Sequence, residues 1–134
     1  MTKWLVDTNI ISAFMKGNPA VMEAVSHYVK RHKRLSLSII TYYELLRGLK
    51  ALGSDKKIIT FQAFMAQCEI ITLTQPIIEA AADIYATLKN QGMLIEDADI
   101  LIAATALNKE MSLVTDNQEH FRRVHGLKIH NWLT

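Results

Sequence analysis

The 134-residue sequence predicts an α/β fold built on a short, largely parallel sheet of five strands. Short apolar, partly β-branched runs alternate along the chain with longer segments whose apolar residues recur at helical spacing. The segments between the expected strands are long enough to hold helices, as crossovers between parallel strands require. Half of the residues are hydrophobic and only five are glycine, so we expect one ordered domain over 1–134.

The expected elements follow from start and stop signals along the chain. Strands are expected at 3–7, 35–39, 68–73, 112–115 and 127–130, the last at an edge of the sheet. Thr8 or Asn9 is the expected N-cap of a short first helix, and Asn18-Pro19 begins the second. Thr41 and Glu44 have the spacing of a capping box. Later helices are expected at 55–67, 74–91, 96–104 and 118–124.

Two of these helices show apolar stripes that should face the core. The stripe of the 41–52 helix includes Leu52, and that of the 74–91 helix includes Ile78 and Tyr85. The helix beginning at 96 starts with acids and then becomes apolar on nearly every face, which predicts that it is packed inside the domain.

Composition and charge exclude several classes of protein. The net charge of +2, from 15 basic and 13 acidic residues, is too small to indicate nucleic-acid binding by itself. The only cysteine, Cys68, excludes an internal disulfide and a cysteine zinc site, and it fits a reducing compartment. No signal peptide or membrane span is visible, so a soluble cytoplasmic protein is expected. The basic run 30–34 suits a helix C-terminus, and it is also the densest patch available for a phosphate backbone.

Four acids fall where strands end or helices begin. Asp7 ends the first strand, Glu44 and Asp99 lie in the first turns of helices, and Asp116 follows the fourth strand. Each has a structural explanation as a cap, first-turn or turn residue. In a parallel sheet, however, the carboxyl ends of the strands share one edge with the N-termini of the helices that follow. Asp99 reaches this edge only if its buried helix begins there.

Carboxylates gathered at one edge repel each other unless a cation neutralises them. All-oxygen ligands favour Mg²⁺ or Mn²⁺ over zinc. A carboxylate-held magnesium ion polarises phosphoryl oxygens and activates water. The chemistry indicated is hydrolysis of a phosphodiester.

Four segments, in order, resemble PIN-domain ribonucleases, and specifically VapC-type toxins of type II toxin–antitoxin pairs. They are LVDTNIIS at 5–12, YELLRG at 43–48, DILIAATA at 99–106, and LVTDN at 113–117 with Phe121 behind it. The resemblance covers nearly the whole chain. It implies a three-layer α/β/α sandwich, usually dimeric, and a magnesium-dependent endoribonuclease. It also implies an antitoxin partner whose tail lies over an apolar groove and blocks the site.

The resemblance implies that Asp7, Glu44 and Asp99 hold the catalytic Mg²⁺, with Mn²⁺ as a possible substitute. Many PIN domains place a fourth acid two residues after the threonine that ends strand four, and here that position is Asn117. Asp116 lies one residue earlier, so either Asp116 or Asn117 is expected to assist.

Three further residues are candidates for positioning water or phosphate. Thr8 and Thr115 are expected to orient either one, although helix capping and strand-end hydrogen bonding explain them equally well. Arg47, one turn beyond Glu44, is a candidate phosphate contact or an ordinary exposed helix residue.

Two competing functions remain open at this point. A PIN-like domain whose fourth acid is lost at Asn117 would bind RNA or a partner with little or no nuclease activity. A phosphate-binding domain of response-regulator type also places an acid at a strand end. That class predicts a lysine at a late strand end, where Lys109 and Lys128 are poorly placed, and it leaves Glu44 and Asp99 unexplained.

Overall fold

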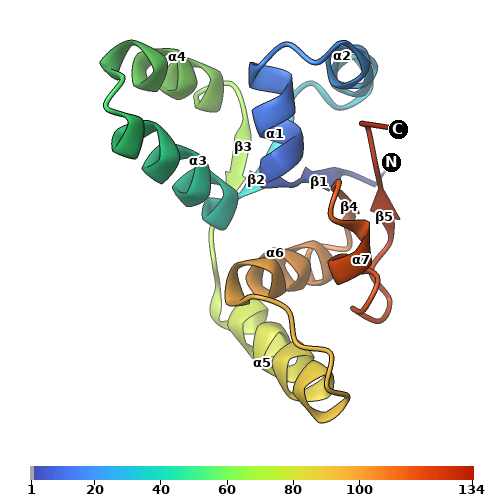
Figure 1. Cartoon of the computed structure of the whole chain (residues 1–134). Coiled ribbons are helices and arrows are strands. Elements are labelled where there is room, and N and C mark those ends of the chain that lie inside the picture. The colour runs from blue at the N-terminus through green and yellow to red at the C-terminus, as the bar shows by residue number, and fades with distance from the viewer. Residues whose placement is uncertain (1) are drawn as a thin grey trace.

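The computed structural model describes residues 2–134, and over that range it contains a five-stranded, wholly parallel sheet (Figure 1). The strands are β1 (Trp4–Val6), β2 (Ser36–Ser38), β3 (Glu69–Ile71), β4 (Ser112–Val114) and β5 (Ile129–His130). Their order across the sheet is β3-β2-β1-β4-β5, with every neighbouring pair parallel. The predicted α/β class and the edge position of the last strand are therefore confirmed.

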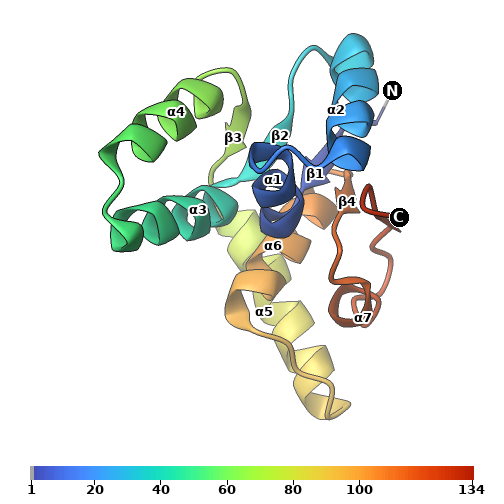
Figure 2. The same ribbon diagram turned by 45° about the horizontal axis from the view of Figure 1, so that its top comes forward.

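Helices cover both faces of this sheet, giving the three layers that the family resemblance implies. They are α1 (Thr8–Met15), α2 (Pro19–His32), α3 (Ile39–Leu52), α4 (Asp55–Met65), α5 (Gln75–Asn90), α6 (Asp97–Asn108) and α7 (Gln118–Phe121). Figures 1 and 2 show α1 to α4 on one side of the sheet and α5 with α6 on the other. Within the described residues, no helix is long and apolar enough to cross a membrane.

Two apolar cores result, because successive strand residues point to opposite faces. Leu5 and Leu113 pack with α5 and α6, whereas Val6 and Val114 pack with the helices on the opposite face. Helix α6 is buried along most of its length from Ile100 to Ala106, as its apolar composition predicts. Its position under β1 and β4 fixes where its acidic first turn emerges.

The starts of two helices differ from the predictions. Asp7 itself caps α1, accepting a hydrogen bond from the backbone N–H of Thr8 at 2.8 Å, so neither Thr8 nor Asn9 is the cap. Helix α3 begins at Ile39, and the buried Ser38 hydroxyl accepts from the N–H of Ile40 at 3.0 Å. The predicted capping box at Thr41 is therefore wrong, because a serine ending β2 offers an acceptor earlier in the chain. Glu44 lies in the second turn of α3.

Three residues expected to face the core are exposed instead. Leu52, at the end of α3, is 64% exposed, while Ile78 is 46% and Tyr85 40% exposed on α5. Helix α5 lies outside α6 and contributes Ile77, Ala81 and Leu88 as its buried residues. A helix packed mainly against one other helix needs only a narrow apolar stripe, so the outer part of the predicted stripe remains at the surface.

The cap of α3 gives a test of how this helix is positioned. Ser38→Ala should lower the free energy of unfolding by about 1 kcal/mol, because it removes the acceptor for an N–H at a buried helix start. Urea unfolding would measure the loss, with Ser26→Ala, the same change at an exposed position within α2, as the matched control. Equal stability of Ser38→Ala and the wild type would show that Ser38 is not an effective cap.

Candidate active site

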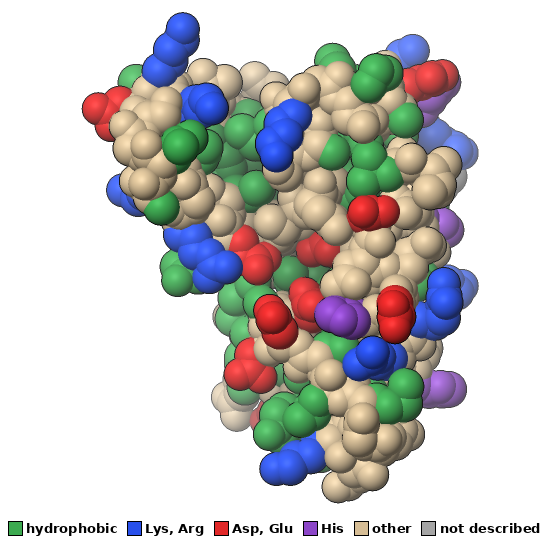
Figure 3. Space-filling view, viewed as in Figure 1, with side chains coloured by type: hydrophobic (Ala, Val, Ile, Leu, Met, Phe, Trp, Pro, Cys, Tyr) green, Lys and Arg blue, Asp and Glu red, His purple; other side chains and the backbone are tan. Residues whose placement is uncertain are grey.

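A cleft of about 860 Å³ opens at the carboxyl edge of the sheet and contains three of the predicted acids. Asp7 enters it from the end of β1, Glu44 from α3 and Asp99 from the first turn of α6. Figure 3 shows acidic side chains gathered in the middle of this face, where α1, α3 and α6 approach one another. The buried helix α6 therefore begins at the same edge, as the clustering of the acids requires.

Asp7 is the most deeply buried acid of the cleft. Its side chain accepts two hydrogen bonds, from the Thr8 N–H to Oδ1 at 2.8 Å and from the Thr115 hydroxyl to Oδ2 at 2.7 Å. The residue is 5% exposed. Asp7 can therefore cap α1 and also line an acidic cleft, because Oδ1 accepts from Thr8 and Oδ2 accepts from Thr115.

Burial raises the pKa of Asp7 from 3.8 to about 6. Desolvation of the carboxylate is the main cause, and the negative charges of Asp99 and Glu44 add to it. The two hydrogen bonds lower the pKa of Asp7, but they do not offset the effect of burial. A positive charge placed in the cleft would relieve this cost, and that is the electrostatic signature expected of a cation site.

Glu44 is held by a hydroxyl pair that connects α1 to α3. The Thr8 hydroxyl lies 2.6 Å from Glu44 Oε1 and 3.1 Å from the Thr41 hydroxyl. Because Thr8 has one hydroxyl proton and the shorter contact is to a carboxylate, Thr8 donates to Glu44, and Thr41 can donate to Thr8. Thr8 therefore orients Glu44, a contact that sequence reasoning assigned only generally to water or phosphate.

Asp99 is half-buried, and its pKa is raised, mainly by desolvation and further by the charges of Glu44 and Glu96. Its Oδ2 lies 3.6 Å from Nδ1 of His120, a residue on the short helix α7. The same nitrogen lies 2.9 Å from the side-chain amide nitrogen of Asn117. Sequence reasoning missed His120, although its position three residues after Asn117 places both on one side of a helical turn.

The structure separates the two candidates for the fourth position. Asn117 lines the cleft, and its N–H donates to the Thr115 hydroxyl at 2.9 Å. Asp116 is exposed, does not line the cleft, and accepts a hydrogen bond from the Asn131 side chain at 3.0 Å. Asn117 is thus adjacent to the hydroxyl that holds Asp7, whereas the Asp116 side chain faces the segment after β5.

The positive charges near the cleft are not those that the sequence suggested. Arg47 lies 4.0 Å from Glu44 at the exposed surface, stacks over the Tyr43 ring and does not line the cleft. Lys16, Lys56 and Lys57 line it instead, from the C-terminus of α1 and the N-terminus of α4. No local sequence pattern brings these lysines together, because their proximity depends on how α1 and α4 pack around α3.

The donor set suits a hard divalent cation, but its members do not enclose one completely. In the part of the chain that the structure describes, no three His, Cys, Asp or Glu side chains are arranged as a direct metal cage. Mg²⁺ commonly retains several waters and takes only one or two carboxylates directly. Oxygen ligands with raised pKa values at Asp7 and Asp99 therefore fit a partly hydrated Mg²⁺ and do not fit a closed zinc site.

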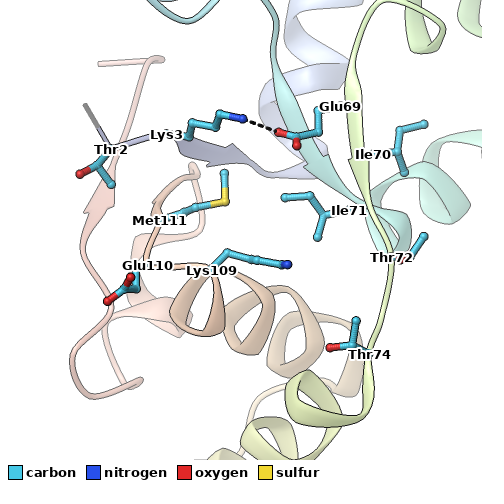
Figure 4. Close-up of a pocket in the computed structure, with 10 residues that line it drawn as sticks. All are labelled: Thr2, Lys3, Glu69, Ile70, Ile71, Thr72, Thr74, Lys109, Glu110 and Met111. Carbon is cyan, nitrogen blue, oxygen red and sulfur yellow. Dashed lines mark hydrogen bonds and ion pairs between the residues drawn. The ribbon is translucent and has the colours of Figure 1, made fainter.

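A second cavity, of about 690 Å³, lies at the opposite edge of the sheet (Figure 4). Lys3 and Glu69 form an ion pair at 3.3 Å on one wall, and Lys109 extends from the end of α6 on the other. The Ser36 hydroxyl and Lys3 lower the pKa of Glu69, so this carboxylate is stably ionised and already paired. The cavity contains none of the four predicted acids and offers no comparable site.

Comparison with known proteins agrees with this geometry. The PIN domain profile matches residues 4–127. The chain belongs to the PIN-domain family. A VapC1 ribonuclease from Methanocaldococcus jannaschii is 34% identical over 97% of this chain and 88% of its own length. PIN-domain nucleases use divalent metal ions, in keeping with the acidic cleft.

Two solved structures of relatives share the fold of this PIN domain over almost its full length. VapBC-1 from nontypeable Haemophilus influenzae matches with a TM-score of 0.81 and 30% identity, covering 98% of each chain. DNA-bound VapBC from Salmonella typhimurium matches with a TM-score of 0.87 and 25% identity, covering 98% of this chain and 99% of that one. Both are structures of VapBC proteins.

The raised pKa of Asp7 predicts how the stability of the metal-free protein depends on pH. The folded chain holds a proton on Asp7 up to about pH 6, whereas an ordinary aspartate loses it near 3.8. Between these values the folded state binds more protons than the unfolded state, so stability falls as pH rises and then levels off. Asp7→Asn lacks this titration.

The stability of Asp7→Asn relative to wild type should therefore increase by roughly 2 kcal/mol between pH 4 and pH 6.5. Urea unfolding in EDTA, repeated across this range, would measure the difference, and Asp97→Asn is the matched control. A difference between Asp7→Asn and wild type that does not vary with pH would show that Asp7 titrates normally.

Proposed function

We propose that this PIN domain is a magnesium-dependent endoribonuclease, the VapC-type toxin of a toxin–antitoxin pair, which hydrolyses RNA phosphodiester bonds. The observation that carries the proposal is the meeting of Asp7, Glu44 and Asp99 in one cleft, where burial and mutual repulsion raise two of their pKa values. The family and the relatives named as ribonucleases support the choice of RNA as substrate.

The roles proposed for the side chains follow from their contacts. Asp7, Glu44 and Asp99 would hold the ion, with Thr115 fixing the Asp7 carboxylate and Thr8 fixing that of Glu44. When bound, Mg²⁺, or Mn²⁺ in its place, polarises the phosphate and activates water for attack. Lys16, Lys56 and Lys57 supply the positive charge that a phosphate backbone requires along the cleft wall.

The same cleft is the proposed site of inhibition by a VapB-type antitoxin. Beyond the acids it continues along the apolar side chains Met15, Leu45 and Leu49, which suits an apolar peptide segment lying over the catalytic groups. The VapBC assemblies among the structural relatives support such a partner, and we propose a homodimer as the toxin's own state. Co-purification with the product of an adjacent small reading frame, together with loss of cleavage in that complex, tests the partner.

The metal ligands are tested by changing one charge at a time. Asp7→Asn, Glu44→Gln and Asp99→Asn should each reduce magnesium-dependent RNA cleavage by at least about 100-fold, because each removes a proposed ligand. Circular dichroism would check that the variants remain folded. Asp97→Asn is the control, since Asp97 precedes Asp99 by two residues, is exposed and does not line the cleft.

Normal cleavage by folded Asp7→Asn would refute the site assignment. Chelation with EDTA should stop wild-type cleavage, and added Mg²⁺ should restore it. RNA binding by the purified wild-type protein without metal-dependent cleavage would instead identify a PIN-like binding domain without nuclease activity.

The fourth position is tested by a pair of neighbouring variants. Asn117→Ala should reduce the cleavage rate by roughly tenfold, because it removes the side-chain amide that lines the cleft and contacts His120. Asp116→Asn should have a much smaller effect, since its carboxylate faces Asn131 rather than the cleft. Steady-state kinetics under saturating Mg²⁺ would compare the two, and a larger loss in Asp116→Asn would reverse the assignment.

A further inference from the structure

A separate groove lies on the α2 side of the sheet and is lined by aromatic rings. Trp4 begins β1, Tyr28 lies in α2 and Trp132 follows β5, and the groove that they line encloses about 500 Å³. The ring centroids of Trp4 and Trp132 lie 6.2 Å apart, and those of Tyr28 and Trp132 lie 5.8 Å apart. The N–H of Trp4 donates to the Tyr28 hydroxyl at 2.9 Å, which fixes β1 against α2. We call this feature the aromatic groove.

Stacking between rings supports the aromatic groove, and some of its rings remain accessible to solvent. His130 stacks on Trp4 at 4.0 Å, and His32 stacks on Tyr28 at 4.3 Å. Tyr28 is buried, whereas Trp132 and His32 are partly exposed and line the opening. Partly exposed flat rings on a fixed support are the surfaces on which unpaired nucleobases stack.

Positive charge surrounds this groove. Arg31 lines it, and the adjoining end of α2 carries the exposed Lys30, Lys33 and Arg34. Lys128 is exposed, and it is close enough to His130, which stacks on Trp4, to add to the lowering of the His130 pKa by burial. Lys, Arg and His side chains are visible along the right-hand edge of Figure 3, on the side of α2 and the C-terminal segment.

Among the described residues, no acid lines the aromatic groove. Glu23, the acid of α2, is exposed and lies 3.8 Å from His27 at the wall of the groove. The positive charge around the groove complements a polyanion, and the rings complement bases that are not paired with each other. Double-stranded nucleic acid would present phosphates, sugars and base edges, but its base faces are stacked inside the duplex and are not available to the rings.

We propose that the aromatic groove binds single-stranded RNA, as a second contact surface for a substrate whose reactive phosphate lies in the acidic cleft. The proposal rests on the nuclease function proposed above. Trp4 begins β1 and Asp7 directly follows its end, so their backbone positions lie roughly 10 Å apart. The groove and the cleft thus lie at the two ends of one short strand, and an RNA strand that continues from the cleft around the molecule would reach the groove.

The chain contains its own reporter for this binding. Its two tryptophans, Trp4 and Trp132, both line the aromatic groove, so tryptophan fluorescence observes this groove and not the acidic cleft. A 12-nucleotide oligouridylate titrated in EDTA, which prevents metal-dependent cleavage, should quench the fluorescence through stacking. Poly-L-glutamate of similar charge, which has no bases, should not.

Charge reversal separates binding at the groove from general attraction to a basic protein. Lys30→Glu and Lys128→Glu should each weaken oligouridylate binding by about tenfold in low salt, because each places a repulsive charge beside the phosphates. Lys50→Glu makes the same change of charge on the exposed end of α3 and should weaken binding far less. Circular dichroism would confirm folding, and the two groove variants provide independent tests should one fail to fold.

Each outcome separates the binding proposal from the proposed nuclease. Absence of quenching, equal quenching by poly-L-glutamate, or equal weakening by Lys50→Glu would overturn the RNA groove, whether or not the protein cuts RNA. Metal-dependent cleavage of total cellular RNA, measured in parallel, tests the nuclease alone. Quenching without any cleavage would retain RNA binding at the groove and overturn its role in substrate cleavage.

Discussion

The burial of the Asp7 carboxylate is the constraint on which the site depends. A carboxylate that is 5% exposed is costly to ionise, and its pKa of about 6 records that cost. The chain nevertheless directs Glu44 and Asp99 toward the same cleft, which makes ionisation harder still. Hydrogen bonds from Thr8 and Thr115 hold the geometry without removing the electrostatic cost. The arrangement therefore suits a positively charged ligand, because such a ligand would offset the electrostatic cost of ionising Asp7.

The parallel sheet explains how acids so distant in sequence come together. Strand β1 is central, with β2 and β4 on either side, so residues that follow these strands share one edge. Glu44 and Thr115 reach that edge from the segments after β2 and β4, and Asp99 reaches it because α6 runs beneath the sheet. The apolar faces of α6 thus do more than fill the core, since they fix the direction in which its first turn points.

Sequence reasoning predicted the fold class, the strand positions and the acids that meet, because these depend on periodicity and on the direction of parallel strands. It was wrong about the capping box at Thr41, since Ser38 already satisfies the helix start. It could not choose between Asp116 and Asn117, because one residue of turn geometry decides which side chain enters the cleft. Lys16, Lys56 and His120 were missed for a related reason, since their positions depend on packing between elements.

Strand β1 also connects the acidic cleft and the aromatic groove, the two surfaces proposed to contact RNA. Its first residue, Trp4, is held by Tyr28 and stacked by His130, while Asp7 directly after its last residue is held by Thr8 and Thr115. Between them, Leu5 and Val6 point into opposite cores and are fully buried. A short strand packed on both faces has little freedom to shift, so the aromatic groove and the acidic cleft keep a fixed separation. That rigidity would allow bases held at one end of β1 to set which phosphate reaches the acids at the other.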